Sequence, residues 1–97
     1  MTCRYGVFIS DFPESNNKGK QFFNEITEYI NSLDEKMESV WIPDHVAPYL
    51  DKPDNEDLIE AYTTISYLSA IHQDKTFGTM VTCNNFRNPA LLAKMTA

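Results

Sequence analysis

The sequence predicts an α/β protein with three parallel β/α units in a single domain over residues 1–97. Stretches rich in β-branched and aromatic residues alternate with stretches whose apolar residues repeat at helical spacing, in the order β-α-β-α-β-α. Each predicted strand is short and apolar throughout, which is typical of parallel strands that are covered on both faces. Prolines and polar turn formers separate these stretches.

The first unit begins with a predicted strand at residues 4–9, which ends at a polar segment closed by Pro13. Turn-forming residues continue to Gly19. From Lys20 the apolar residues are spaced by one, three or four positions, which predicts a helix over residues 20–33. Its apolar stripe consists of Phe22, Phe23, Ile26, Tyr29, Ile30 and Leu33.

The second unit has a short predicted strand at residues 39–42, which Pro43 ends. A proline-rich loop follows, and helical periodicity then predicts a helix over residues 56–72. Asp54 or Asn55 is the candidate N-cap, with two acidic residues in the first turn. His72 falls on the apolar stripe near the end of this helix, which favours a core or helix-end histidine over a catalytic one.

The third unit has a predicted strand at residues 76–82, where Gly78 indicates close packing or a bend. Asn88 followed by Pro89 is a good helix start, which predicts a helix over residues 89–96. Right-handed connections between successive parallel strands predict the spatial order 1-2-3.

Composition excludes several classes of protein. The net charge of −6, from 14 acidic and 8 basic residues, would repel nucleic acid. No apolar run is long enough to span a membrane and the N-terminus does not resemble an export signal, so we expect a cytoplasmic protein with free thiols at Cys3 and Cys83. The histidines and cysteines do not have zinc-ligand spacing, so no metal site is expected.

Polar residues follow each predicted strand, and the carboxyl ends of parallel strands lie side by side. Asp11, Asp44 and His45 follow the first two strands, and Thr82 and Cys83 end the third. One mouth would therefore hold carboxylates, an imidazole, a hydroxyl and a thiol, which are groups that grip a polar cofactor or move a proton.

Each of these residues also has a structural alternative. Asp11 could form an Asx turn, and Asp44 could accept hydrogen bonds from nearby loop amides. Cys83 has no base placed by the sequence to activate it, which favours a buried structural thiol. Trp41 could fill the core or wall a flavin pocket. No glycine-rich phosphate motif follows the first strand, which disfavours an ordinary dinucleotide fold.

Four segments together resemble the opening of luciferase-like monooxygenases and their deazaflavin-dependent relatives. They are Tyr-Gly-Val-Phe-Ile from Tyr5, Ser-Val-Trp-Ile-Pro-Asp-His from Ser39, Gly-Thr-Met-Val-Thr from Gly78 and Arg-Asn-Pro-Ala-Leu-Leu-Ala-Lys from Arg87. The resemblance covers essentially all 97 residues. Departing from the pattern, Lys-Met-Glu stands before Ser39 where relatives often carry Gly-Phe-Asp.

The resemblance implies the first third of a TIM (β/α)₈ barrel that binds FMN or the deazaflavin coenzyme F-420 at its mouth. Members transfer a hydride, or use reduced flavin and oxygen, to act on a small-molecule substrate. His45 matches a histidine that in relatives lies beside the flavin ring and serves substrate binding or acid/base chemistry, which makes it the catalytic candidate. The cofactor-binding candidates are Asp11 and Asp44, together with the segment Val81, Thr82 and Cys83, which would pack behind the isoalloxazine, often through a non-proline cis peptide. The segment from Arg87 looks structural.

A complete barrel needs about 250 residues, whereas this chain has 97. We therefore expect an N-terminal fragment of such an oxidoreductase that is inactive alone, with the deazaflavin favoured over FMN by resemblance. The alternative is a small non-catalytic α/β binding or assembly module derived from that fold. Either would self-associate through exposed sheet edges and an apolar face, or be only marginally stable.

Overall fold

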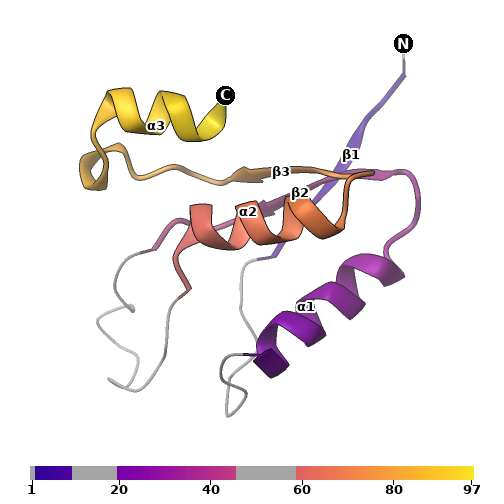
Figure 1. Cartoon of the computed structure of the whole chain (residues 1–97). Coiled ribbons are helices and arrows are strands. Elements are labelled where there is room, and N and C mark those ends of the chain that lie inside the picture. Colours follow the sequence, from indigo (N-terminus) through magenta and orange to yellow (C-terminus); the bar gives the residue numbers. More distant parts are fainter. Residues whose placement is uncertain (1, 10–19, 46–58) are drawn as a thin grey trace, which may run out of the picture.

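A computed structural model describes residues 2–9, 20–45 and 59–97 of the chain and has an α/β architecture. Its three strands form one parallel sheet in the order β1-β2-β3 (Figure 1). The parallel pairing and the predicted spatial order are both confirmed. In chain order the elements are β1 (Tyr5–Phe8), α1 (Lys20–Ser32), β2 (Met37–Ile42), α2 (Ala61–Ile71), β3 (Thr76–Thr79), the 3₁₀ turn η1 (Asn84–Phe86) and α3 (Pro89–Thr96).

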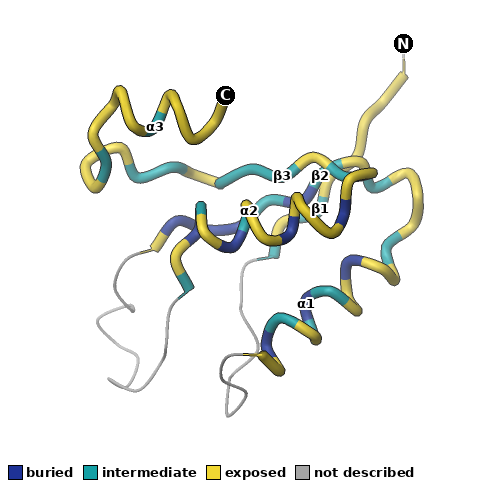
Figure 2. The backbone as a smooth tube through the Cα atoms, viewed as in Figure 1, coloured by how far each residue is buried: buried dark blue, intermediate teal, exposed yellow. Residues whose placement is uncertain are grey.

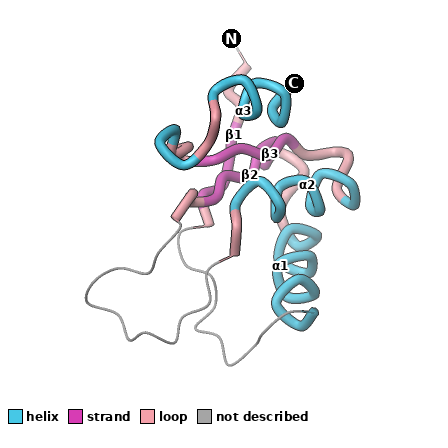
Figure 3. Tube along the Cα trace, turned by 60° about the vertical axis from the view of Figure 1, so that its left-hand side comes forward, coloured by secondary structure: helices cyan, strands magenta, loops and turns pink. Residues whose placement is uncertain are grey.

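The core lies between one face of the sheet and the helices α1 and α2. Val40, at the centre of β2, is fully buried against the apolar stripe of α1 and against Leu68 of α2. The buried positions of Figure 2 follow this interface. Both crossover helices therefore cover the same face of the sheet, and Figure 3 shows the same arrangement from another side. The α1 residues in the core are Phe22, Ile26 and Ile30, all on the stripe that the periodicity predicted.

The opposite face of the sheet carries Trp41, whose register partners are Phe8 on β1 and Gly78 on β3. Side chains alternate along a strand, so Ser39 and Trp41 point away from the face that Val40 covers. A Cβ atom at Gly78 would lie only 2.6 Å from a carbon of the Trp41 ring, and one at Gly6 would lie 3.0 Å from its Nε1. Close packing at Gly78, one of the two predicted alternatives, is confirmed. Trp41 is only half-buried, so it lies outside the core.

Three element boundaries differ from the sequence prediction by two residues or more, and the first is the start of β2, at Met37 rather than at residue 39. β3 ends at Thr79 rather than at residue 82, because its partner β2 ends at Ile42 and offers its last carbonyl to the Met80 amide at 2.8 Å. α2 begins at Ala61, because the Glu60 carboxylate accepts hydrogen bonds from the backbone amides of Tyr62 and Thr63 and caps the helix there. The predicted N-cap at residue 54 or 55 is therefore wrong, and those two residues lie outside the described parts of the chain.

α3 has the predicted start. Asn88 is its N-cap and accepts from the amides of Ala90 and Leu91 at 2.9 and 3.4 Å, with Pro89 in the first helical turn. None of its residues is buried, and Leu91 is 54% exposed. In Figure 1 the helix lies beyond the end of β3, on the other side of that strand from α2.

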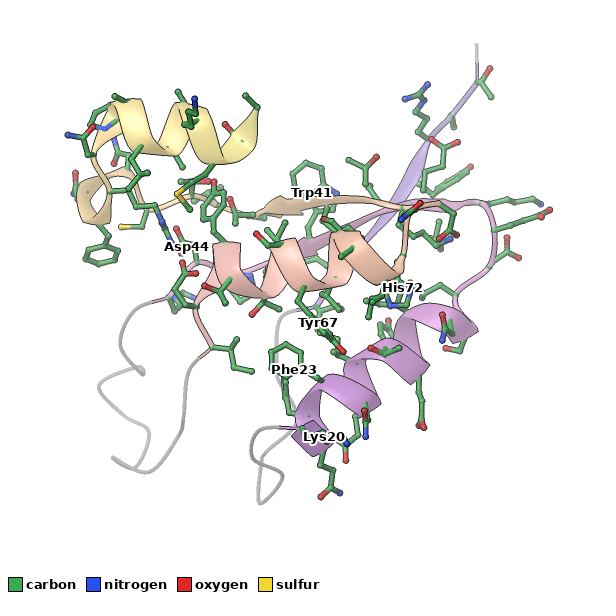
Figure 4. The ribbon with its side chains drawn as sticks, viewed as in Figure 1. Lys20, Phe23, Trp41, Asp44, Tyr67 and His72 are labelled. Carbon is green, nitrogen blue, oxygen red and sulfur yellow. The ribbon has the colours of Figure 1, made fainter. Side chains whose placement is uncertain are left out.

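His72 has the structural position that its place on the stripe predicted. It is the C-cap residue of α2, is 5% exposed, and its amide donates to the carbonyl of Leu68 at 2.9 Å. Its ring lies near Phe77 of β3, with 6.3 Å between the ring centroids, and points into the layer between the sheet and the helices (Figure 4). Both cysteines are free thiols: Cys3 is exposed and Cys83 is half-buried.

Candidate functional site

An open hollow of about 690 Å³ lies at the carboxyl ends of the strands. The end of β1, the segment after β2 and the segment after β3 all contribute to its wall. Its lining residues are Phe8, Pro43, Asp44, His45, Met80, Val81, Thr82, Cys83, Asn84 and Phe86.

The structure brings together five of the six residues that the sequence singled out. Asp44, His45, Val81, Thr82 and Cys83 all line this hollow. The sixth, Asp11, lies outside the described residues. Residues from two strand ends, nearly forty positions apart in the chain, therefore meet where the parallel topology predicts.

The wall combines apolar surface with a few polar groups. Phe8 is 42% exposed, Met80 47% and Val81 75%, so these side chains offer contact area to a ligand. The exposed His45 and the half-buried Thr82 and Cys83 supply an imidazole, a hydroxyl and a thiol. Small-molecule sites commonly have this composition, with apolar walls and a small number of placed polar groups.

The peptide bond between Met80 and Val81 is cis. The bond lies one residue beyond the end of β3, in the segment where the resemblance implied a non-proline cis peptide. Val81 and Thr82 therefore belong to the loop that walls the hollow, not to the strand.

Asp44 lines the hollow, yet its carboxylate is fully engaged within the protein. Oδ2 accepts from the Cys83 amide at 2.8 Å and from Nη1 of Arg87 at 2.5 Å, while Oδ1 accepts from Nη2 of Arg87 at 2.8 Å. The side chain is only 1% exposed. The Arg87 hydrogen bonds outweigh burial and hold the pKa of Asp44 below its usual value.

The Arg87 side chain links its own segment after η1 to the segment after β2 and to the start of α2. Besides its bidentate pair with Asp44, its Nη2 donates to Glu60, the N-cap of α2, at 2.5 Å. Its guanidinium also stacks over the Tyr62 ring, 4.5 Å from the centroid. The bonds to Asp44, and then those to Glu60, raise the pKa of Arg87 further above its usual value.

Glu60 is held ionised by the same network. Burial opposes its charge, but the Thr63 amide and the Arg87 side chain stabilise the carboxylate and place its pKa at about 2. Its side chain remains 49% exposed, so solvent screens part of this interaction.

A short chain of hydroxyl groups holds the other side of the wall. The Tyr62 hydroxyl and Thr82 Oγ1 are 2.8 Å apart, and Thr82 Oγ1 is also hydrogen-bonded to Thr79 Oγ1. Thr82 is thus tied both to α2 and to the end of its own strand.

Sequence reasoning identified five of the ten described lining residues and missed the residues that hold them in place. Glu60 and Tyr62 were not singled out, and the segment from Arg87 was predicted to be structural without a partner. One signal was present: Arg87 is the one charged residue between Lys75 and Lys94. That isolation makes Arg87 a candidate for an ion pair but does not identify its partner.

Comparison of the chain with known protein families, with curated proteins and with solved structures found no match. Within the described residues, no helix is long and apolar enough to cross a membrane. The same parts of the chain contain no cluster of three or more histidine, cysteine or acidic residues that could hold a metal ion.

Proposed function

We propose that this chain supplies the first three β/α units of a luciferase-like (β/α)₈ barrel that binds FMN or the deazaflavin coenzyme at the strand ends. The full barrel would act on a small-molecule substrate by hydride transfer or monooxygenation. One observation carries the proposal: the strands run in sequential parallel order, both crossover helices cover one face, and the hollow opens at the carboxyl ends of the strands. A barrel of this class has the same winding and the same place for its active site.

The open face of the sheet also supports a barrel. On this face, Trp41 is half-buried and Phe8 is exposed, while no described strand residue there is buried. The sequence predicted strands covered on both faces, but helices cover only one face in the described structure. In a (β/α)₈ barrel the second face is the interior, which side chains from the other strands fill.

The groups around the hollow suit a flavin or deazaflavin ring. Such a ring is planar and largely apolar with polar edges, and the wall offers apolar area from Phe8, Met80 and Val81 beside the exposed His45. An imidazole can both donate and accept a proton, which suits it to general acid–base chemistry. His45 is therefore the residue we assign to proton transfer at the reacting atom of the substrate.

A non-catalytic assembly module is the second candidate, and the sheet edges favour it. Within the described residues, β1 and β3 each pair on one side only, so their outer edges carry unpaired backbone groups. In this alternative the open apolar face and the edges would mediate self-association.

The proposal is tested by adding FMN or the deazaflavin coenzyme to the ¹⁵N-labelled chain and recording amide chemical shifts. We expect weak binding, with an affinity poorer than micromolar and shifts concentrated at His45 and at the segment from Val81 to Asn84. The chain alone should turn over no flavin-dependent substrate. The buried His72 amide serves as the internal control and should not move.

Three results would count against it. Absence of any saturable shift at the hollow would remove the proposed ligand class. Shifts centred on another surface would move the site, and micromolar or tighter binding would contradict the expected need for the remaining barrel. The assembly alternative gains support instead if light scattering shows a concentration-dependent oligomer while neither cofactor perturbs the hollow.

A further inference from the structure

The residues around Asp44 form a bridge between the two strand ends that wall the hollow. Asp44, which is labelled in Figure 4, lies after β2. Cys83 lies after β3, and Arg87 lies after η1. All three are linked by the two oxygens of one carboxylate, which accept one backbone and two guanidinium hydrogen bonds. A hydrogen-bonding arrangement of this kind fixes geometry, because the planar guanidinium fork matches both carboxylate oxygens at once.

This bridge leaves Asp44 little capacity for a ligand. Its side chain is 1% exposed and the Arg87 side chain 10% exposed. Thr82 and Cys83 therefore form the wall that a ligand in the hollow would contact. The Asp44 carboxylate points into the protein, towards this wall. A bound ring would contact the wall, and the wall's position depends on the bridge.

We propose that Asp44 and Arg87 are a positioning pair that fixes the Thr82 and Cys83 wall of the hollow, and that Asp44 acts in this way instead of contacting the ligand. Glu60 and Tyr62 anchor the pair to the start of α2 through Arg87. The inference rests on the proposed function only for the identity of the ligand. The geometry of the wall is independent of that identity.

The test uses Asp44→Asn, which keeps the shape of the side chain and removes its charge. One side-chain oxygen would become an NH₂ donor facing either the Arg87 guanidinium or the Cys83 amide, so at least one hydrogen bond is lost. Asp74→Asn is the matched control, because it makes the same change in net charge at a carboxylate whose side chain is 72% exposed. Amide hydrogen exchange at Cys83 is the readout, with the His72 amide reporting on the core.

We expect Asp44→Asn to speed exchange at Cys83 by about tenfold or more, because the Cys83 amide loses its charged acceptor and the two-pronged bond to Arg87 that holds this acceptor in place is broken. The His72 amide should change far less, and Asp74→Asn should leave both unchanged. Equal exchange at Cys83 in the two variants would overturn the proposal. An equal increase at Cys83 and His72 in Asp44→Asn would overturn it as well, since the bridge would then only stabilise the fold.

Arg87→Lys decides the question if Asp44→Asn does not fold. Lysine keeps the charge but not the two-pronged geometry of the guanidinium. Faster exchange at Cys83 with an unchanged His72 amide would support the positioning role of the pair. Unchanged exchange at Cys83 would overturn the proposal. A second readout is alkylation of Cys83 by iodoacetamide in a Cys3→Ser background. The rate should rise in Asp44→Asn or Arg87→Lys and stay constant in Asp74→Asn.

A ligand experiment separates this inference from the proposed function. FMN added to the wild-type chain should shift the Thr82 and Cys83 amides, and the same FMN concentrations should shift them several-fold less in Arg87→Lys. If neither FMN nor the deazaflavin coenzyme shifts any wild-type amide at the hollow, the proposed function fails, while the exchange experiment still decides whether the pair positions the wall. FMN shifts of equal size in both proteins would overturn the link between the pair and binding.

Discussion

Substitution of Gly78 by alanine tests whether the Trp41 ring is packed as closely against the sheet as the structure indicates. The new methyl group would lie 2.6 and 2.8 Å from two carbons of the ring, well inside van der Waals contact. The ring must therefore tilt, which would disturb the hydrogen bond from its Nε1 to Ser39 Oγ at 3.0 Å. Inserting a methylene-sized group into a well-packed core costs about 1–3 kcal/mol, and the lower part of this range applies here because Trp41 is only half-buried.

Two further contributions set the net value. Loss of the Trp41 hydrogen bond adds about 1 kcal/mol, and restriction of the unfolded chain by alanine returns roughly 0.4–1 kcal/mol. We therefore expect Gly78→Ala to lower the free energy of unfolding by about 1–3 kcal/mol, measured by urea denaturation with far-UV circular dichroism.

A double-mutant cycle identifies the cause of this loss. In a Trp41→Ala background the obstructing ring is absent, so Gly78→Ala should cost nothing or be slightly stabilising. If Gly78→Ala leaves the wild-type stability unchanged, or costs as much without Trp41 as with it, the packing argument is refuted.

Three other predictions concern pH, catalysis and helix capping. The folded-state pKa values of Glu60 and Asp44 are depressed, to about 2 from 4.5 and below 3.8 respectively. The stabilisation from these two carboxylates is therefore present at neutral pH and is lost as the pH falls through this range. The urea concentration at the midpoint of unfolding should drop between about pH 4.5 and 2. A midpoint that does not change with pH would contradict the network. In a complete barrel that carries this segment, His45→Ala should lower kcat by about 10²–10⁴-fold in steady-state assays, whereas His72→Ala should leave kcat unchanged; the reverse pattern would remove His45 from the chemistry. Asn88→Ala should destabilise α3 by about 1 kcal/mol, seen as a loss of helical Cα chemical shifts confined to α3, and unchanged shifts there would argue against the cap.

The order and direction of the elements could be predicted because each depends on local sequence patterns. The apolar stripe that contains Phe22, Ile26 and Ile30 identified α1, and Asn88 with Pro89 identified the start of α3. Boundaries that depend on a partner could not be predicted in the same way. Residues 80–82 have strand-forming side chains, but β2 offers no further backbone partner beyond Ile42.

The site was predictable in outline and not in its connections. Parallel topology places the ends of β2 and β3 together, so His45 and Cys83 could be assigned to one hollow from the sequence. The partner of Asp44 could not, because Arg87 lies 43 residues further along the chain and reaches it only through the fold. Periodicity carries no information about such a pair.

The arrangement around Trp41 connects the fold to the proposed barrel. Inside a (β/α)₈ barrel, the side chains of one layer come from alternate strands, so a large inward residue fills space in front of a neighbouring strand. Here the large ring comes from the middle strand and covers Gly78, its register partner on β3, where a Cβ atom would lie 2.6 Å from it. On β1 the register partner is Phe8, and a Cβ atom at Gly6 would meet Ser39 Oγ at 2.3 Å. The helix-covered face has no such pattern, since Val7, Val40 and Phe77 all contribute side chains to it. The pairing of a large residue on β2 with a glycine on β3 thus belongs to the face that would become the barrel interior, which is why the effect of Gly78→Ala bears on the proposed architecture as well as on stability.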